Sequence, residues 1–108
     1  MKIEKATQED HHILTEITKK SKAFWGYSVE QMTIWSDALT ISEEYIKTHF
    51  VYKLIQENQA IGYYSYYFEN EKTIKLDNLF LLPEFIGKGI GNQLMTDFSH
   101  RIHQIPTI

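Results

Sequence analysis

The stretch Asp77–Met95, DNLFLLPEFIGKGIGNQLM, joins an apolar run, a proline and three glycines at alternate positions. The apolar run stops at Pro83, and Gly87, Gly89 and Gly91 then open a segment with helical periodicity. Because glycine loses more conformational freedom on folding than any other residue, three of them so close together need a reason. The order predicts a strand that runs into a glycine-rich turn and then into the N-terminus of a helix.

Such a turn is suited to binding an anion. The first turn of a helix leaves backbone N–H groups without partners, and the helix dipole adds partial positive charge. Glycines let phosphate oxygens reach these N–H groups, and Lys88 adds a cation. The spacing is neither that of a P-loop nor that of a Rossmann fingerprint, whose third glycine is replaced by Asn92 or Leu94. The alternative is a tight turn whose glycines serve packing alone, and three glycines favour the anion.

The overall composition is that of one small globular domain, residues 1–108. Its 43% hydrophobic and 23% charged residues show no sign of disorder, and a net charge of −3 argues against binding to nucleic acid. The absence of cysteine excludes disulfides, thiolate metal sites and a cysteine nucleophile. The N-terminal residues lack the apolar core of a signal peptide, and no run approaches the length of a membrane span. We therefore expect a cytoplasmic protein.

The periodicity along the chain predicts an α+β fold with an antiparallel sheet. The segment 2–7 has the alternation of a short strand, and Thr7 with Asp10 fits the capping box of a helix that Gly26 ends. Helices are also expected from Ser28 to Leu39, after Thr40 or Ser42, and over 88–104; strands are expected over 49–56, 60–69 and 73–82. The short turns ENQ and NEK between these strands indicate a meander with helices packed over it. The apolar faces predicted for the first and last helices are Leu14, Ile17, Ser21 and Phe24, and Ile90, Leu94, Met95, Phe98 and Ile102.

The stretch LDNLFLLPEFIGKGIGNQL resembles the acetyl-CoA-binding motif of the GNAT superfamily of N-acetyltransferases. That motif is a strand, a Pro-Glu-aromatic segment and then (Gln/Arg)-x-x-Gly-x-(Gly/Ala), with Ile86 here in the Gln/Arg position. Upstream, FWGYSVEQMTIWSDALTISEEYI resembles the acceptor-side helices of small bacterial members. The resemblance implies a GNAT-like antiparallel sheet with N-terminal helices and a C-terminal pyrophosphate-binding helix. It also implies acetyl-CoA as co-substrate and a primary amine of a small molecule or peptide as acceptor.

The resemblance assigns roles to particular residues. The backbone of Phe80, Leu81 and Leu82 would contact the pantetheine arm. The pyrophosphate would be held by Gly87, Lys88, Gly89, Ile90, Gly91 and Asn92.

For the acceptor side, the resemblance implies that Asp77 helps to deprotonate the amine, and we expect burial beside Leu76 and Leu79 to strengthen it as a base. The alternative is that Asp77 is an ordinary polar position on an alternating strand. Trp25 and Tyr27 would wall the acceptor pocket, or they would belong to the core. No metal site is expected.

The family fold normally continues beyond this helix with a further strand that forms the second wall of the cofactor slot, and nothing after residue 104 has that pattern. We therefore expect an exposed apolar edge strand over 76–82 and a homodimer or larger assembly. Without cysteine, the expected reaction is direct attack of the amine on the thioester. The alternatives are a catalytically silent relative that binds coenzyme A or another anion, and a self-associating truncation product.

Overall fold

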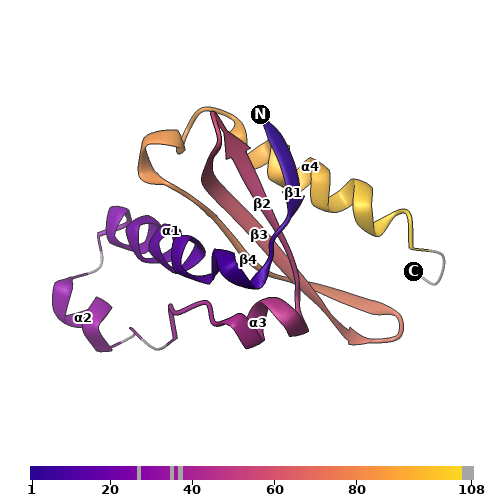
Figure 1. Cartoon of the computed structure of the whole chain (residues 1–108), viewed down its shortest axis with the longest axis horizontal. Helices are drawn as coiled ribbons and strands as arrows, with labels where there is room; N and C mark the ends of the chain where they lie inside the picture. The colour runs from indigo at the N-terminus through magenta and orange to yellow at the C-terminus, as the bar shows by residue number, and fades with distance from the viewer. Residues whose placement is uncertain (27, 35, 37, 106–108) are drawn as a thin grey trace.

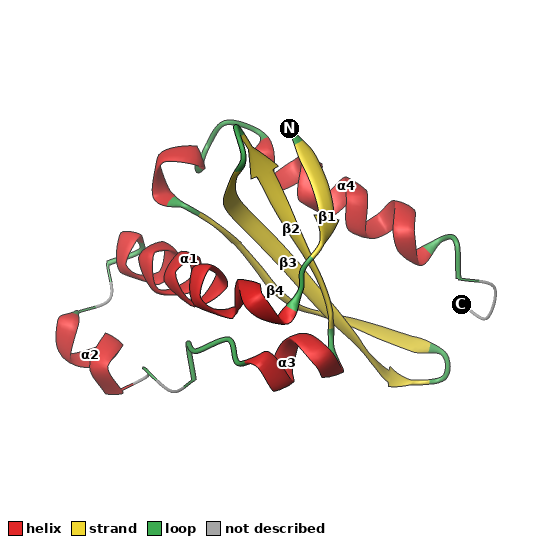
Figure 2. Cartoon of the chain, in the orientation of Figure 1, coloured by secondary structure: helices red, strands yellow, loops and turns green. Residues whose placement is uncertain are grey.

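The computed structural model describes residues 1–26, 28–34, 36 and 38–105, and it has the predicted α+β architecture (Figures 1 and 2). The elements are β1 (Lys2–Lys5), the 3-10 helix η1 (Gln8–Asp10), α1 (His11–Phe24), α2 (Val29–Ile34), α3 (Glu43–Thr48), β2 (Phe50–Gln56), β3 (Gln59–Asn70), β4 (Thr73–Leu81), the 3-10 helix η2 (Pro83–Phe85) and α4 (Ile90–Ile102). The four strands form one sheet in the order β1-β2-β3-β4, and every neighbouring pair is antiparallel. No helix in the described ranges has the length and apolar character needed to cross a membrane.

The helix starts are set by local hydrogen bonds of the kind that the sequence predicts. Thr7 donates its backbone N–H to Asp10 Oδ2 over 2.8 Å, which is one of the two hydrogen bonds of the expected capping box. Ser28 Oγ accepts the N–H of Gln31 over 3.0 Å at the start of α2. Of the two possible caps for α3, Ser42 is the one used, because its Oγ accepts from the backbone of Tyr45.

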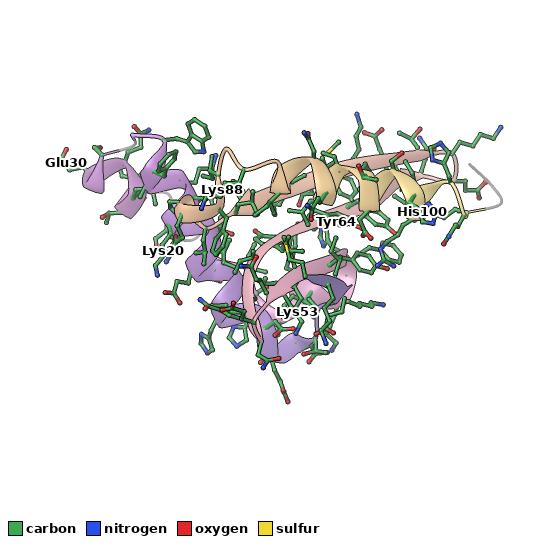
Figure 3. The ribbon with its side chains drawn as sticks, turned by 90° about the horizontal axis from the view of Figure 1, so that it is seen from above. Lys20, Glu30, Lys53, Tyr64, Lys88 and His100 are labelled. Carbon is green, nitrogen blue, oxygen red and sulfur yellow. The ribbon has the colours of Figure 1, made fainter. Side chains whose placement is uncertain are left out.

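The sheet separates two layers of helices (Figures 1 and 3). Tyr63 reaches α1, where its hydroxyl lies 2.5 Å from Thr18 Oγ1. The next residue, Tyr64, donates to Asp97 Oδ2 on α4 over 2.5 Å. Because successive residues of a strand point to opposite faces, these bonds place α1 and α4 on opposite sides of β3. The core therefore has two parts, with Leu14 and Ile17 buried on the α1 side and Ile90 and Leu94 buried on the α4 side.

Three details differ from the prediction. Helix α2 ends at Ile34, so Leu39 is buried from the segment that follows the helix and not from the helix itself. Phe24 and Met95, which were expected on apolar faces, are 52% and 43% exposed. Trp35, which belongs to the helix predicted from Ser28 to Leu39, lies outside the described residues.

Candidate functional site

The glycine-rich turn leaves open space where side chains would otherwise stand. Gly87 and Gly89 have φ angles of +84° and +80°, a left-handed conformation that residues with a Cβ rarely adopt. A Cβ added at either residue would meet no atom within 4 Å, and one added at Gly91 would meet only Leu81 Cδ1, at 3.9 Å. Backbone conformation therefore accounts for two of the glycines, while packing requires none of the three.

Beside this turn lies a cleft with a volume of about 440 Å³. One wall is the apolar side of β4, and the other is the glycine turn with the first turns of α4. Its lining residues are Leu76, Leu79, Gly87, Gly89, Gly91, Asn92 and Met95. Four of the predicted cofactor residues thus share one cleft. The sequence did not predict three of the lining residues, Leu76, Leu79 and Met95. The strand alternation and the helical period predict which face of an element each residue lies on, but not that these faces border the same cleft.

The cleft ends at backbone groups that can bind an anion. The N–H groups in the first turn of α4 have no partner within the helix. In the described part of the chain, the N–H groups of Gly87, Lys88 and Gly89 donate no backbone hydrogen bond. The Lys88 ammonium lies at the start of α4, 6.0 Å from the Phe85 ring (Figure 3). This end of the cleft therefore has N–H donors, a helix dipole and a cation together.

The edge of β4 supplies a second set of backbone groups. Leu82 donates its N–H to Ile61 O over 2.8 Å and accepts the N–H of Phe85 over 3.0 Å, so its backbone is engaged inside the protein. Because alternate residues of an antiparallel strand direct their N–H and C=O groups to opposite sides, Leu81 and Leu79 direct theirs toward the open edge. The geometry therefore favours Leu79 and Leu81 over Phe80 and Leu82 as backbone contacts for an extended ligand.

Asp77 occupies a β-bulge in β4. Asn78 pairs with Ser65 and Leu76 pairs with Tyr66, so Asp77 is an extra residue with no partner on β3. Its side chain is exposed, and the predicted burial beside its leucine neighbours is wrong. The bulge also breaks the alternation of side chains along β4 at Asp77.

The bulge brings Asp77 against Tyr45 of α3, a residue that the sequence does not single out. The Tyr45 hydroxyl donates a hydrogen bond to Asp77 Oδ2. Burial, and then the neighbouring Asp77 carboxylate, raise the pKa of Tyr45 well above its ordinary value. Helix α3 has only six residues, too few for a periodic pattern to indicate which of its side chains face the sheet.

Of the two predicted acceptor residues, Trp25 is the one that the structure describes. Trp25 caps the C-terminus of α1, is 64% exposed and packs edge-on against Phe24 at a centroid distance of 5.3 Å. It is not among the described residues that line the cleft. Tyr27 lies outside the described residues.

Several solved structures with the same fold are named as acetyltransferases. The PaiA N-acetyltransferase of Thermoplasma acidophilum, solved in complex with coenzyme A, is 22% identical with a TM-score of 0.81, over 99% of this chain and 76% of that one. A GNAT family acetyltransferase of Brucella melitensis, in complex with acetyl-CoA, is 18% identical with a TM-score of 0.74, over 98% and 70%. An acetyltransferase of Vibrio fischeri is 17% identical with a TM-score of 0.71, over 100% and 91%.

Other similar structures are covered less completely: the chain spans 63% of a Rhodopseudomonas palustris protein and 60% of a Bacillus cereus protein. A comparison with curated protein sequences finds no match. The model of the acetyltransferase (GNAT) family matches residues 11–102, from the start of α1 to the end of α4. The chain therefore belongs to the GNAT acetyltransferase family.

Proposed function

We propose that the protein is an N-acetyltransferase that transfers an acetyl group from acetyl-CoA directly to a primary amine of a small molecule or peptide. The observation that carries this proposal is the cleft in which the apolar side of β4 meets the open glycine turn of α4. Membership of the GNAT family and the coenzyme-bound relatives support it.

The residues present fit such a ligand. Leu76 and Leu79 would lie along its apolar arm, and the outward backbone groups of Leu81 would pair with the amides of that arm. The N–H groups between Gly87 and Gly91, with Lys88, would hold the pyrophosphate. When bound, acetyl-CoA supplies the acetyl group as a thioester that an amine can attack. Ile86, in the position where the motif has Gln or Arg, packs against the core, so the contact with phosphate relies on backbone groups.

The acceptor amine must lose a proton before it can act as a nucleophile, and Asp77 is the proposed base. Its carboxylate is exposed and fixed through Oδ2, and no described residue donates a hydrogen bond to Oδ1. A negative net charge favours a cationic amine as acceptor. Trp25 and Tyr27 remain predictions as acceptor contacts, as does the cytoplasmic location.

We also propose that the chain forms a homodimer through the part of the β4 edge that precedes Leu79, where the coenzyme arm would leave backbone groups open. This strand is the last in the sheet order, and Leu76 on it is 38% exposed. An edge strand with free N–H and C=O groups is a template for pairing with another chain. Light scattering at micromolar concentration measures the mass directly, and a monomer under these conditions contradicts this part of the proposal.

Calorimetric titration with acetyl-CoA, followed by thiol release in the presence of a panel of amines, tests the function. The protein has no cysteine, so it adds no background to a thiol assay. Absence of binding at millimolar acetyl-CoA refutes the proposal. Binding without thiol release for any amine identifies a relative that binds the coenzyme without transferring the acetyl group.

A pair of glycine variants separates binding from folding. Gly89 and Gly26 both have a left-handed φ, +80° and +91°, and an added Cβ meets no atom within 4 Å at either one. Gly89→Val and Gly26→Val should therefore lose a similar stability, about 1–2 kcal/mol. Only Gly89→Val should lose affinity for acetyl-CoA, because its side chain fills the turn. Equal affinity in the two variants contradicts the location of the site.

A further inference from the structure

The Tyr45 hydroxyl is the centre of a hydrogen-bond cluster that joins α3, β3 and β4. It contacts Asp77 Oδ2, lies 2.7 Å from Ser65 Oγ and lies 3.0 Å from Asn78 Nδ2. Asp77 and Asn78 are adjacent in the chain, and both reach the same hydroxyl because the bulge removes the usual alternation between them.

The chemistry of these groups assigns every donor. An ionised carboxylate only accepts, so the single phenol hydrogen of Tyr45 is donated to Asp77. The hydroxyl of Ser65 and the amide nitrogen of Asn78 must then both donate to the Tyr45 oxygen. The Tyr45 hydroxyl thus gives one hydrogen bond and accepts two, which is its full capacity.

The phenol ring is also held in place. The His49 ring stacks on it with a centroid distance of 3.9 Å and an interplanar angle of 11°, and Tyr67 meets His49 edge-on at 5.7 Å. Ser65, which donates to the hydroxyl, is completely buried. The direction of the Tyr45 hydrogen bond is therefore fixed by both the ring and its oxygen.

We propose that Tyr45 is a positioning residue that holds Asp77 Oδ2 and so leaves Oδ1 directed to the acceptor amine. This inference rests on the proposed function, in which Asp77 accepts the proton that the amine loses. Donors in a chain polarise one another, so Ser65 and Asn78 strengthen the bond that Tyr45 gives to the carboxylate. The pKa of Tyr45 is raised by its burial and by Asp77, so the phenol keeps its hydrogen across the pH range of an enzyme assay.

Several other titratable or charged groups are near this pair. On α3 and its C-cap they are Tyr45 itself and His49, which stacks on it. On β3 they are Tyr63, which interacts electrostatically with both Tyr45 and Asp77, and Tyr67. From α1, Lys22 lies 5.6 Å from the Phe80 ring centroid, three residues along β4 from Asp77. Tyr45 is the one among them for which a hydrogen bond to Asp77 is observed in the described residues.

Tyr45→Phe tests the inference, because it keeps the ring that stacks on His49 and removes only the hydroxyl. Without the donor to Oδ2, the Asp77 carboxylate is no longer held with Oδ1 toward the amine. Tyr45→Phe should therefore lower kcat for the amine by about tenfold and change KM less than about twofold. The affinity for acetyl-CoA should change less than about twofold, since the hydroxyl is outside the cleft. Tyr67→Phe is the matched control, a tyrosine that contacts His49 and not Asp77, and it should leave kcat unchanged.

A measurement that needs no activity separates this inference from the proposed function. In NMR spectra at neutral pH, the signal of the Asp77 carboxyl carbon, assigned with Asp77→Asn, should shift in Tyr45→Phe, which removes the donor to Oδ2, and stay unchanged in Tyr67→Phe. Ser65→Ala, which removes one donor to the phenol, should shift this signal less in the same direction. An unshifted signal in Tyr45→Phe overturns the inference even if the enzyme is active. A shifted signal with no thiol release from the unmodified protein supports the hydrogen bond and refutes the proposed function.

Discussion

Replacing Tyr64 by phenylalanine removes the hydroxyl that fastens α4 to the sheet. The Tyr64 side chain is completely buried, and its hydroxyl donates to Asp97 Oδ2 over 2.5 Å. The same oxygen accepts from Arg101 Nε over 2.7 Å, and the Arg101 guanidinium lies 4.0 Å from the centroid of the Tyr52 ring. Figure 3 shows Tyr64 between Lys88 and His100, along the length of α4. The hydroxyl thus connects the centre of the sheet to the middle of the helix whose start forms the cleft.

The cost of the substitution follows from these contacts. Phenylalanine keeps the buried ring and opens no large cavity. A hydrogen bond to a charged group contributes about 1.5–3 kcal/mol. Asp97 is partly exposed and retains Arg101, so the low end, about 1.5 kcal/mol, is expected. With an unfolding entropy of about 0.23 kcal/mol/K for 108 residues, this corresponds to a fall in Tm of about 7 °C.

Thermal and urea unfolding, followed by circular dichroism, measure the effect. Tyr67→Phe serves as control on the other face of β3, and its free energy of unfolding should change by less than about 0.5 kcal/mol. A double-mutant cycle with Asp97→Asn should give a coupling of about 1 kcal/mol, because the charged acceptor is the part that strengthens the bond. A loss below about 0.5 kcal/mol in Tyr64→Phe would refute the reasoning that this bond fastens α4.

Three further predictions concern pH, packing and charge. Burial raises the pKa of Tyr63 and of Tyr64 above the ordinary value of 10, so these residues keep their protons in the folded state when the unfolded chain loses them. Their contribution to the free energy of unfolding is complete below about pH 10 and declines above it, by about 1.4 kcal/mol per pH unit for each tyrosine. Urea midpoints measured up to about pH 11.5 should therefore fall less steeply with pH in Tyr64→Phe than in the unmodified protein. Equal slopes would contradict this prediction. Gly62→Ala should destabilise the fold by about 1–3 kcal/mol in thermal unfolding. The new Cβ would lie 2.5 Å from Leu81 Cδ2 and 2.9 Å from a backbone carbonyl oxygen of β4. An unchanged Tm would show that β3 and β4 can move apart to make room. Lys88→Gln should weaken acetyl-CoA binding by about threefold to tenfold at low salt in calorimetry, and by a smaller factor at high salt. If the affinities of the variant and the unmodified protein differ by the same factor at both salt concentrations, Lys88 makes no charge contact with the ligand.

Local signals were enough to predict most of the fold. Ser42 and the pair Thr7 and Asp10 mark helix starts with side chains that satisfy backbone groups nearby in the chain. The ENQ turn is confirmed as a hairpin in which Glu57 and Asn58 both have positive φ angles, 52° and 64°. Each of these features depends on residues within a few positions of one another, so the sequence alone is enough to predict them.

The candidate site was predicted less completely, because its parts meet through tertiary structure. The glycine turn is a local motif, and the cleft confirms that Gly87, Gly89, Gly91 and Asn92 lie together. The exposure of Asp77 and its contact with a residue of α3 depend on a bulge. A strand with a bulge and a regular strand can have the same residue types, so no pattern in the sequence distinguishes them.

The bulge also suggests how such a site could be gained or lost in evolution. If Asp77 were deleted, Leu76 would still pair with Tyr66 and Asn78 with Ser65, and the two strands would pair without interruption from Gly62 and Leu81 to Phe68 and Ile74, with their core faces unchanged. The acidic group is therefore a one-residue insertion in an otherwise regular stretch of the ladder, separate from the irregularity between Phe68 and Asn70. A single codon could add or remove it without rebuilding the hydrophobic core, so closely similar folds in this family could differ in whether they carry this carboxylate.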